Sequence, residues 1–327
     1  MFNGRRVQGR GVNHEKIAPE LRNLVRWMPP LPFGNAGGRW LIRKLSHIDR
    51  RTGFEGGTLE LVRVGMLNLR VYRPDHHVSG AALVWIHGGG YVVGAPAQDH
   101  ARCAAVCREL GIVVVSVGYR LAPEHPYPAA LNDCFSAWQW LLAAVQRLGV
   151  DPARIAIGGQ SAGGGLAAAL VQRLCDTAGL VPKAQWLFCP MLDDRTAARR
   201  ELDGVKHPIW NNRQNAIGWR AYLGHNPGSA RTRPYSVPSR RTDLSGLPAT
   251  WIGIGDLDLF LEESQIYATR LKASGVAVTL EIVAGAPHGF ESLAPRTMIA
   301  RTYVAAAQDW LADALEIPPS GAMHVDR

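Results

Sequence analysis

The chain has 327 residues, 47% of them hydrophobic, so it can bury one large core. Its apolar runs fall far short of the roughly 18 residues that a membrane span requires, which excludes integral membrane association. The formal net charge is +9, but the basic residues are scattered without a groove-reading motif, so the charge predicts a solvated basic face and no nucleic-acid partner.

Residues 1–50 do not follow the alternation of strands and helices that marks most of the chain, and we expect them to form the N-terminal part of a helical cap. Their apolar residues either line a wall of a pocket or pack onto the sheet; these are Leu24, Val25, Trp27, Met28, Leu31 and Phe33. No apolar signal core follows Met1, so a cytoplasmic location is expected.

Strands and helices then alternate, a pattern typical of a mostly parallel sheet covered by helices on both faces. Residues 61–73 predict antiparallel opening strands, and residues 81–86 predict an apolar strand that ends in His-Gly-Gly-Gly at residues 87–90. Residues 112–119 predict a β-branched central strand, and residues 129–148 predict a helix with apolar residues at helical spacing. The chain is therefore expected to adopt an α/β fold.

A second glycine-rich run, Gly-Gln-Ser-Ala-Gly, lies at residues 159–163. Residues 154–158 predict a short buried strand before it, and residues 162–177 predict the helix after it. The flanking glycines allow a sharp turn that lifts the hydroxyl of Ser161 out of the backbone toward a substrate. This setting indicates a nucleophilic serine, and the earlier His-Gly-Gly-Gly run adds backbone amides that can face a developing negative oxygen.

A nucleophilic serine needs a histidine to accept its proton and a carboxylate to orient that histidine. Two later strand-like runs lead to such residues. Residues 250–255 precede Asp256 and Asp258, and residues 280–283 precede His288. Residues two apart face the same side of an extended strand, so strand geometry alone does not choose between the two aspartates.

In these motifs the sequence resembles the bacterial hormone-sensitive-lipase-like carboxylesterases of the α/β-hydrolase fold. That family carries His-Gly-Gly-Gly, Gly-Asp-Ser-Ala-Gly-Gly, Asp-Pro-Leu-x-Asp-Glu and His-Gly-Phe in this order. The matching residues here are 87–90, 159–164, 258–263 and 288–290, and the resemblance covers the chain from about residue 69 to residue 315. Two departures are Gln160, which replaces the usual acid before the serine, and the altered sequence of the acidic motif.

The resemblance implies a catalytic triad of Ser161, His288 and Asp258, because the glutamates at residues 262–263 match the family's Asp-Glu and so favour Asp258 as the acid. Such a triad transfers the acyl group of an ester to the serine, and water then hydrolyses the acyl-enzyme. Gln160 keeps a group that donates and accepts hydrogen bonds, so we expect catalysis to survive the replacement.

The resemblance also implies an oxyanion hole at the two glycine-rich runs. The backbone amides of Gly89, Gly90 and Ala162 are its expected donors, and Gly88 mainly permits the turn. His87 precedes these donors and is expected to be structural. This mechanism requires neither a metal nor another cofactor, and none is predicted.

The implied fold divides the chain into a catalytic core and a cap. Residues 51–192 and 246–327 are expected to form the core, while residues 1–50 and 193–245 form the two parts of the cap. The second part has enough apolar residues for short amphipathic helices, namely Trp210, Ile217, Trp219, Tyr222 and Leu223.

The cysteines are odd in number and lie in predicted helices or strands, so we expect them to be reduced core residues. They are Cys103, Cys107, Cys134, Cys175 and Cys189. Cys103 and Cys107 share a helical face, but no second Cys or His pair accompanies them, so no metal site is predicted.

The sequence therefore predicts a serine carboxylesterase, and the resemblance alone implies short- to medium-chain acyl esters as its small-molecule substrates. One alternative is an oligopeptidase or amidase with the same triad, although such enzymes usually carry a large additional domain for which this chain has no room. The other is a non-catalytic binding receptor of the same fold, but those receptors lack the catalytic histidine, whereas His288 is present. The resemblance also allows a homodimer.

Overall fold

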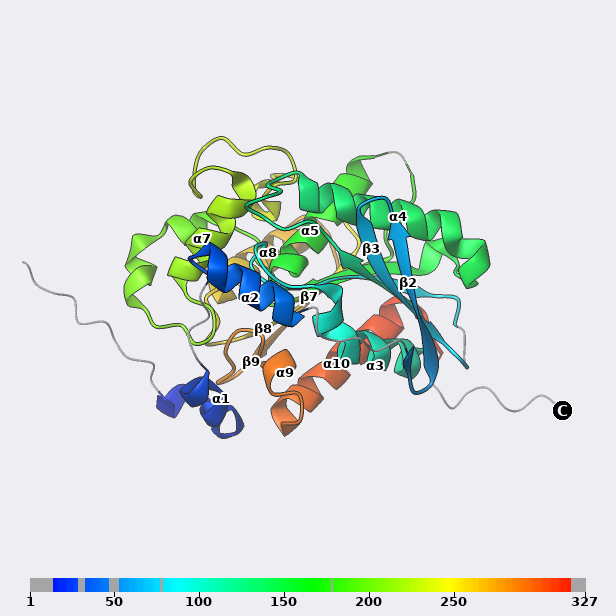
Figure 1. Ribbon diagram of the computed structural model, residues 1–327, viewed down its shortest axis with the longest axis horizontal. Coiled ribbons are helices and arrows are strands. Elements are labelled where there is room, and N and C mark those ends of the chain that lie inside the picture. Colours follow the sequence, from blue (N-terminus) through cyan, green and yellow to red (C-terminus); the bar gives the residue numbers. More distant parts are fainter. Residues whose placement is uncertain (1–13, 29–32, 47–52, 77–78, 178, 319–327) are drawn as a thin grey trace, which may run out of the picture.

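The computed structural model describes residues 14–28, 33–46, 53–76, 79–177 and 179–318. Within these ranges nine strands form one sheet in the order β1-β2-β3-β5-β4-β6-β7-β8-β9, and helices cover both of its faces (Figure 1). The strands are β1 (Gly53–Phe54), β2 (Gly57–Val64), β3 (Leu67–Pro74), β4 (Ala82–Ile86), β5 (Val113–Gly118), β6 (Ile155–Gln160), β7 (Ala184–Phe188), β8 (Ala249–Gly255) and β9 (Val278–Val283).

The sheet is antiparallel at its first end and parallel elsewhere. The pairs β1–β2, β2–β3 and β3–β5 are antiparallel, whereas β5, β4, β6, β7, β8 and β9 run parallel to their neighbours. The predicted opening strands and mostly parallel sheet are thus confirmed. Because parallel strands end at the same edge of a sheet, the turns after β4, β6, β7, β8 and β9 meet there.

The helices follow the expected alternation. The longer ones are α2 (Ala36–Ser46), α3 (His100–Leu110), α4 (Ala129–Leu148), α5 (Ala162–Asp176), α7 (Asn212–Leu223), α8 (Leu261–Ala273) and α10 (Met298–Ala314). The shorter ones are α1 (Arg22–Trp27), α6 (Asp194–Ala198), α9 (Phe290–Leu293) and the 3₁₀ helices η1 (His14–Lys16), η2 (Pro19–Leu21), η3 (Pro96–Asp99), η4 (Pro152–Arg154), η5 (Arg200–Gly204) and η6 (Pro238–Arg240). In the parts of the chain that the structure describes, no helix combines the length and apolar character needed to cross a bilayer.

Two clusters of buried side chains fill the two faces of the sheet. Leu141 of α4 and Leu166 of α5 belong to one cluster with Val84 of β4. Val106 of α3 and Leu311 of α10 belong to the other. All residues of β4 and β6 are buried, because helices cover both faces of these strands, and this explains their continuous apolar character.

The N-terminal segment packs onto the rest of the protein in two places. Ile17 and Leu21 are buried in the core cluster that includes α10, and the N–H of Ala18 donates to the carbonyl of Gly285 at 3.0 Å. Phe33 instead packs its ring edge-on against Trp210 with 5.4 Å between centroids. Trp27 is 74% exposed, so the expectation that it lines a wall or packs onto the sheet is wrong. The predicted wall residue Leu31 lies outside the described residues.

Helix α2 contacts the core through Ile42, which packs against the cluster that contains α4 and α5, and through Arg43. Arg43 donates from Nε to the carbonyl of Val92 and from Nη2 to that of Ala122, both at 2.8 Å. Its guanidinium also pairs with Glu124 at 2.8 Å. A single side chain thus connects the N-terminal segment to the loop after the first glycine-rich run.

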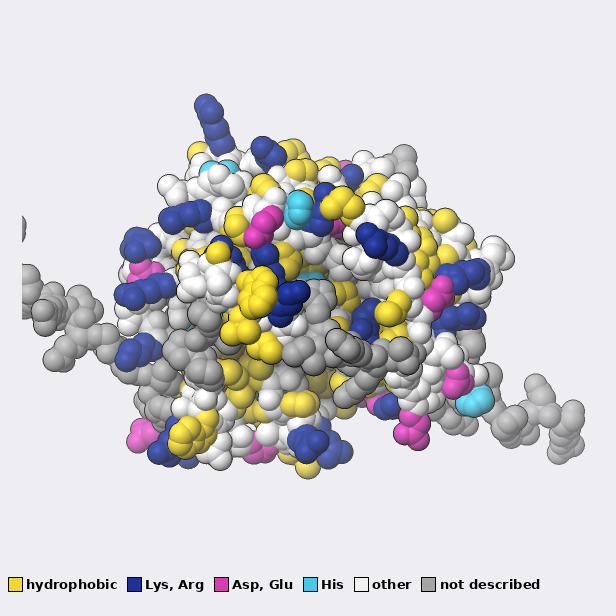
Figure 2. Space-filling view, in the orientation of Figure 1, with side chains coloured by type: hydrophobic (Ala, Val, Ile, Leu, Met, Phe, Trp, Pro, Cys, Tyr) yellow, Lys and Arg dark blue, Asp and Glu magenta, His cyan; other side chains and the backbone are white. Residues whose placement is uncertain are grey.

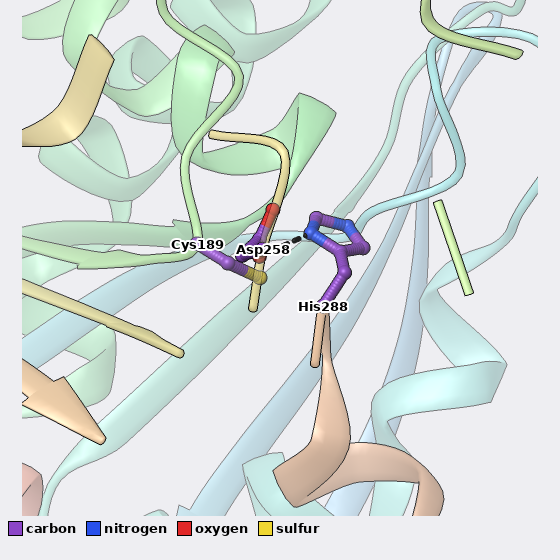
Figure 3. Close-up of side chains that lie close together, drawn as sticks. All are labelled: Cys189, Asp258 and His288. Atoms are coloured by element: carbon purple, nitrogen blue, oxygen red, sulfur yellow. Dashed lines mark hydrogen bonds and ion pairs between the residues drawn. The ribbon is translucent and has the colours of Figure 1, made fainter. Parts of the chain in front are cut away.

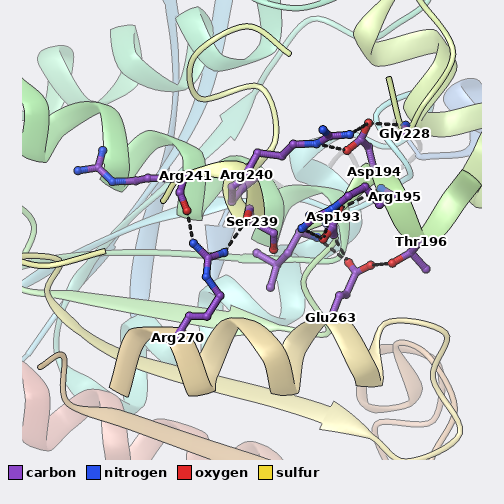
Figure 4. A network of polar contacts seen from close by, with 12 residues as sticks. Asp193, Asp194, Arg195, Thr196, Gly228, Ser239, Arg240, Arg241, Glu263 and Arg270 are labelled. Carbon is purple, nitrogen blue, oxygen red and sulfur yellow. Dashed lines mark hydrogen bonds and ion pairs between the residues drawn. The ribbon is translucent and has the colours of Figure 1, made fainter. Parts of the chain in front are cut away.

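Residues 193–245 hold α6, η5, α7 and η6, and buried polar contacts connect them to the core (Figure 4). Glu263 of α8 accepts the N–H of Leu192 at 2.7 Å, just before this segment begins. The fully buried Asp194 pairs with Arg240 at 2.8 Å, which joins the start of the segment to its end. The segment is therefore closed on itself and anchored at α8.

Cysteine placement agrees with the prediction in all but two respects. All five cysteines are free, and four of them are buried, with Cys175 partly exposed. The expectation that each lies within a helix or strand is wrong for Cys189, which follows the last residue of β7 and has a φ of 35°. The chain leaves the sheet there, because Pro190 comes next and has no N–H to continue the ladder.

Candidate active site

Ser161 occupies the sharp turn between β6 and α5. Its backbone has φ 55° and ψ −119°, a conformation that residues other than glycine rarely adopt. The Ser161 N–H donates to the carbonyl of Phe188 at 2.8 Å, and the Ser161 carbonyl accepts the N–H of Met191 at 2.9 Å. These bonds to the end of the neighbouring strand hold the strained turn in place. The predicted strand, turn and helix are all present.

Gly163 allows the first turn of α5 to approach the end of β4. A Cβ atom at this position would lie 2.1 Å from the carbonyl oxygen of Ile86 and 2.4 Å from that of His87, and both are backbone atoms. We expect Gly163→Ala to lower the free energy of unfolding by about 3 kcal/mol, measured by urea titration. Gly204→Ala is the control, because nothing lies within 4 Å of the added carbon. An equal loss in both variants would contradict the steric explanation.

The structure brings the three predicted triad residues together. His288 Nδ1 donates to Asp258 Oδ2 at 2.7 Å, and Ser161 Oγ donates to His288 Nε2 at 2.9 Å. Asp258 lies in the turn after β8 and His288 in the turn after β9, and all three side chains are buried. Asp258 is itself fixed, since Oδ1 accepts the N–H of Phe260 at 2.9 Å.

The turn after β8 gives the two aspartates different partners. Asp256 is exposed, and its Oδ1 accepts the N–H of Gly285 at 2.7 Å, so it connects two loops. Asp258 is only 4% exposed and contacts the imidazole of His288. The two residues face the same side only while the chain is extended, and the turn separates them.

The environment of His288 acts on its proton affinity in opposite directions. Burial lowers the pKa of the imidazole, but the adjacent Asp258 carboxylate raises it, and the result lies well above the ordinary value of 6.5. A histidine accepts a proton from a serine only when it is neutral. Because its pKa is raised, His288 becomes neutral only at a higher pH than an ordinary histidine.

We accordingly expect kcat/KM for a dissolved ester to rise with pH through an apparent pKa above 6.5 and then to level off. A pH–rate profile between about pH 5 and pH 10 measures this limb. Asp258→Asn is the matched variant, because removal of the neighbouring negative charge moves the limb to lower pH. A limb at or below 6.5 in the unaltered protein would contradict the prediction.

The first glycine-rich run forms a tight turn beside Ser161. Gly89 has φ 124° and Gly90 has φ 58°, both in the region that favours glycine. A Cβ at Gly89 would lie 2.1 Å from the carbonyl oxygen of Val93, and one at Gly90 would lie 2.4 Å from the Trp210 ring. The Ala162 amide belongs to the first turn of α5, where N–H groups have no acceptor within the helix. The first glycine-rich run and the first turn of α5 thus both border the serine.

Gly88 and His87 hold the turn of the first glycine-rich run in place by close packing. A Cβ at Gly88 would lie 3.0 Å from the carbonyl oxygen of Gln160, so the glycine permits close contact with the serine turn. The His87 ring is buried and stacks on Tyr119 with 4.3 Å between centroids, and the Tyr119 hydroxyl donates to the His87 carbonyl at 3.0 Å. These contacts agree with the expected structural role of His87.

A cleft of about 330 Å³ opens at Ser161 and His288. Phe33 and Ile42 of the N-terminal segment and Trp210 of the 193–245 segment form its apolar wall. The Trp210 ring lies 6.2 Å from that of His288. A larger cleft of about 640 Å³ is lined by Asp256 and Asp258 and does not include the serine. The smaller cleft is therefore the one at which chemistry on Ser161 can occur.

Cys189 is a neighbour of the triad that sequence reasoning did not identify. Figure 3 shows its side chain beside Asp258 and His288. The Cys189 sulfur, an Asp258 carboxylate oxygen and a ring nitrogen of His288 all lie within 4.8 Å of one another. Burial raises the pKa of the thiol, which keeps it protonated next to the His288–Asp258 pair. The available signal was positional, since Cys189 follows a strand that ends at the same edge as β6 and β8.

A hydrogen-bonded serine, histidine and aspartate at the carboxyl ends of a mostly parallel sheet define a serine hydrolase of the α/β-hydrolase class. A family model described as the alpha/beta hydrolase fold matches residues 83–292, which is more than half of the chain. Among solved structures, the chain is similar to the bacterial heroin esterase, with a TM-score of 0.85 and 33% identity over 92% of this chain and 99% of that one. It is also similar to the esterase LipW from Mycobacterium marinum, with a TM-score of 0.82 and 35% identity over 93% and 97%.

Sequence relatives agree. Carboxylic ester hydrolase LipN of Mycobacterium tuberculosis is 36% identical over 239 residues, which cover 70% of this chain but only 62% of LipN. Ethyl acetate hydrolase of Pseudomonas putida is 32% identical over 68% of this chain and 71% of its own length. The chain therefore belongs to the bacterial hormone-sensitive-lipase-like carboxylesterases of the α/β-hydrolase family.

Proposed function

We propose that the protein hydrolyses carboxylic esters with short to medium acyl chains, with Ser161 as nucleophile, His288 as general base and Asp258 as the orienting acid. The observation that carries this proposal is the continuous chain of hydrogen bonds, 2.9 Å from Ser161 to His288 and 2.7 Å from His288 to Asp258. A binding receptor of the same fold has no use for a histidine bonded to the serine hydroxyl. The named relatives LipN and ethyl acetate hydrolase support the same reaction class.

The mechanism follows from the roles of these atoms. Ser161 Oγ attacks the ester carbonyl carbon while His288 Nε2 takes the hydroxyl proton. The tetrahedral intermediate collapses, the C–O bond to the alcohol breaks, and His288 returns the proton to the departing oxygen. Water then attacks the acyl-enzyme by the same route and releases the carboxylic acid. Asp258 holds His288 in the required tautomer and stabilises its charged form throughout.

The developing negative oxygen needs donors, and we assign this role to the amides of Gly89, Gly90 and Ala162. Each such donor typically contributes about 3 kcal/mol to the stability of the transition state. The assignment is supported by the position of Gly89 and Gly90, which line the same cleft as Ser161. Gly88 serves the turn itself.

We also propose that residues 1–50 and 193–245 act as a cap that limits what enters the cleft. The support is that Phe33 and Ile42 come from one segment and Trp210 from the other, and all three line the cleft with Ser161. The volume of about 330 Å³ lies at the lower end of the range for ligand pockets. Such a cleft suits small esters better than long acyl chains.

A chain-length series tests the substrate class. We expect kcat/KM for p-nitrophenyl esters to be highest between acetate and hexanoate and to fall toward palmitate, because the cleft of about 330 Å³ is small for a long acyl chain. Initial rates with each ester, measured below its solubility limit, provide the profile. A steady rise toward palmitate would overturn the short-chain assignment, and faster cleavage of aminoacyl p-nitroanilides than of esters would favour an amidase.

We also propose that the protein is cytoplasmic, that it forms a homodimer and that its partner is a small ester substrate. Five free cysteines support a reducing compartment. Cell fractionation tests the location, and sedimentation of the purified protein tests the assembly.

A further inference from the structure

Gln160, the residue immediately before the nucleophile, contacts the helix that follows the catalytic histidine. Its Nε2 donates to Glu291 Oε1 at 2.6 Å and to Ser292 Oγ at 2.8 Å. Gln160 ends β6, and Glu291 lies in α9, three residues after His288. Nothing in the triad chemistry uses these groups. They nevertheless form a direct polar connection between the two loops that must place Ser161 Oγ and His288 Nε2 at bonding distance.

A third element, helix α3, also binds Glu291 and Ser292. Arg102 of α3 donates from Nη2 to Glu291 Oε1 at 3.1 Å and to Ser292 Oγ at 2.9 Å. Its guanidinium lies over the Phe188 ring, 4.4 Å from the centroid, so its own position is held by packing. The side chains of Arg102 and Glu291 are 11% and 2% exposed. The carboxylate of Glu291 is thus buried, with one cation and one neutral amide as its donors.

Gln160 is neutral and Glu291 carries a carboxylate, so a negative charge at position 160 would repel Glu291. An amide at position 160 donates to Glu291 at 2.6 Å, whereas a carboxylate of the same length, as in Gln160→Glu, would face the Glu291 carboxylate without a proton to donate. Other titratable groups within electrostatic reach of Glu291 are Asp99 at the end of η3, Tyr303 of α10 and Cys189. None of these supplies a further positive charge.

We propose that Gln160 and Glu291 are positioning residues that hold the His288 turn against the nucleophile turn, and that they work as a charge-matched pair of one amide and one carboxylate. The inference rests on the proposed esterase function and adds to it a reason for the amide at position 160. It predicts that the identity of each residue depends on the other, and that exchanging them preserves the connection.

A charge exchange tests the pair. We expect Gln160→Glu to lower kcat by about 10- to 100-fold with little change in KM, because the repelled turn moves His288 away from Ser161. The ratio of variant to unaltered kcat should fall further from about pH 5 to pH 8, as the added carboxyl ionises. In Gln160→Glu/Glu291→Gln the donor and the acceptor change places, and kcat should recover to within about threefold of the unaltered protein.

Gln160→Asn is the matched control, because it shortens the side chain without adding charge. It should lower kcat by a factor that does not change with pH. Thermal unfolding of every variant separates a misfolded protein from a misplaced histidine, and the labelling rate of the serine with a fluorophosphonate supplies a second readout that needs no ester.

Two results would overturn the inference: a kcat ratio for Gln160→Glu that stays near one at every pH, or a double variant no better than the worse single variant. The failure of the proposed function looks different, since it requires unaltered protein without esterase activity or a fully active Ser161→Ala.

Discussion

Ser161→Ala is expected to lower kcat for p-nitrophenyl butyrate by about 10⁶-fold, which leaves only the acceleration due to binding and the oxyanion donors. The physical reason is that the Ser161 hydroxyl is the group that donates to His288 Nε2, at 2.9 Å, and the variant removes it. Initial rates at saturating ester measure the effect. Fluorophosphonate labelling, followed by peptide mapping, should place the adduct of the unaltered protein on Ser161 and find none in the variant.

Ser264→Ala is the matched control for this experiment. Its hydroxyl is buried and has no hydrogen-bond partner among the described residues, so its loss should leave activity within about twofold of normal. Equal thermal stability of the two variants would exclude unfolding as the cause of inactivity. Retention of ester turnover in Ser161→Ala would mean that the nucleophile is assigned wrongly.

Asp258→Asn should have the second largest effect, a fall in kcat of about 10⁴-fold. An amide can present its N–H to His288 Nδ1, and this favours the tautomer in which Nε2 carries the proton and cannot accept one from Ser161. The variant should fold normally, because the shape of the side chain is kept and the bond from the Phe260 N–H to the side-chain oxygen can persist.

Asp256→Asn makes the same chemical change two residues earlier and serves as its control. Asp256 is exposed and bonds only the Gly285 N–H among the described contacts, so the variant should retain activity within about threefold and lose about 1 kcal/mol of stability. If Asp256→Asn were the inactive variant and Asp258→Asn the active one, the acid of the triad would have to be reassigned.

Much of this site could be predicted because its chemistry requires particular residues in local patterns. A strand, a turn and a helix around Ser161 are encoded within about twenty consecutive residues, and glycines mark the places where backbones approach closely. Asp256 and Asp258 could not be separated by strand periodicity, since the turn after β8 determines which one faces His288. Motif resemblance supplied that choice, and the hydrogen bond to His288 agrees with it.

The features that sequence reasoning missed depend on contacts between distant segments. Cys189 lies beside the triad only because β7 stands between β6 and β8. Gln160 meets Glu291 across 131 residues of chain. Phe33 and Trp210 were each expected in the cap, but their contact with one another was not predicted. Such contacts follow from strand order and packing, which composition and periodicity within a single segment do not contain.

The strand order also makes the site a measure of complete folding. The nucleophile turn follows β6, but His288 lies 127 residues later, after the edge strand β9. A chain emerging from the ribosome can form the serine turn well before the last two parallel strands have joined the sheet, and at that stage the serine has no base. Reactivity toward a serine-directed probe is therefore expected only after β8 and β9 have joined the sheet. The appearance of this reactivity would report the last step of folding.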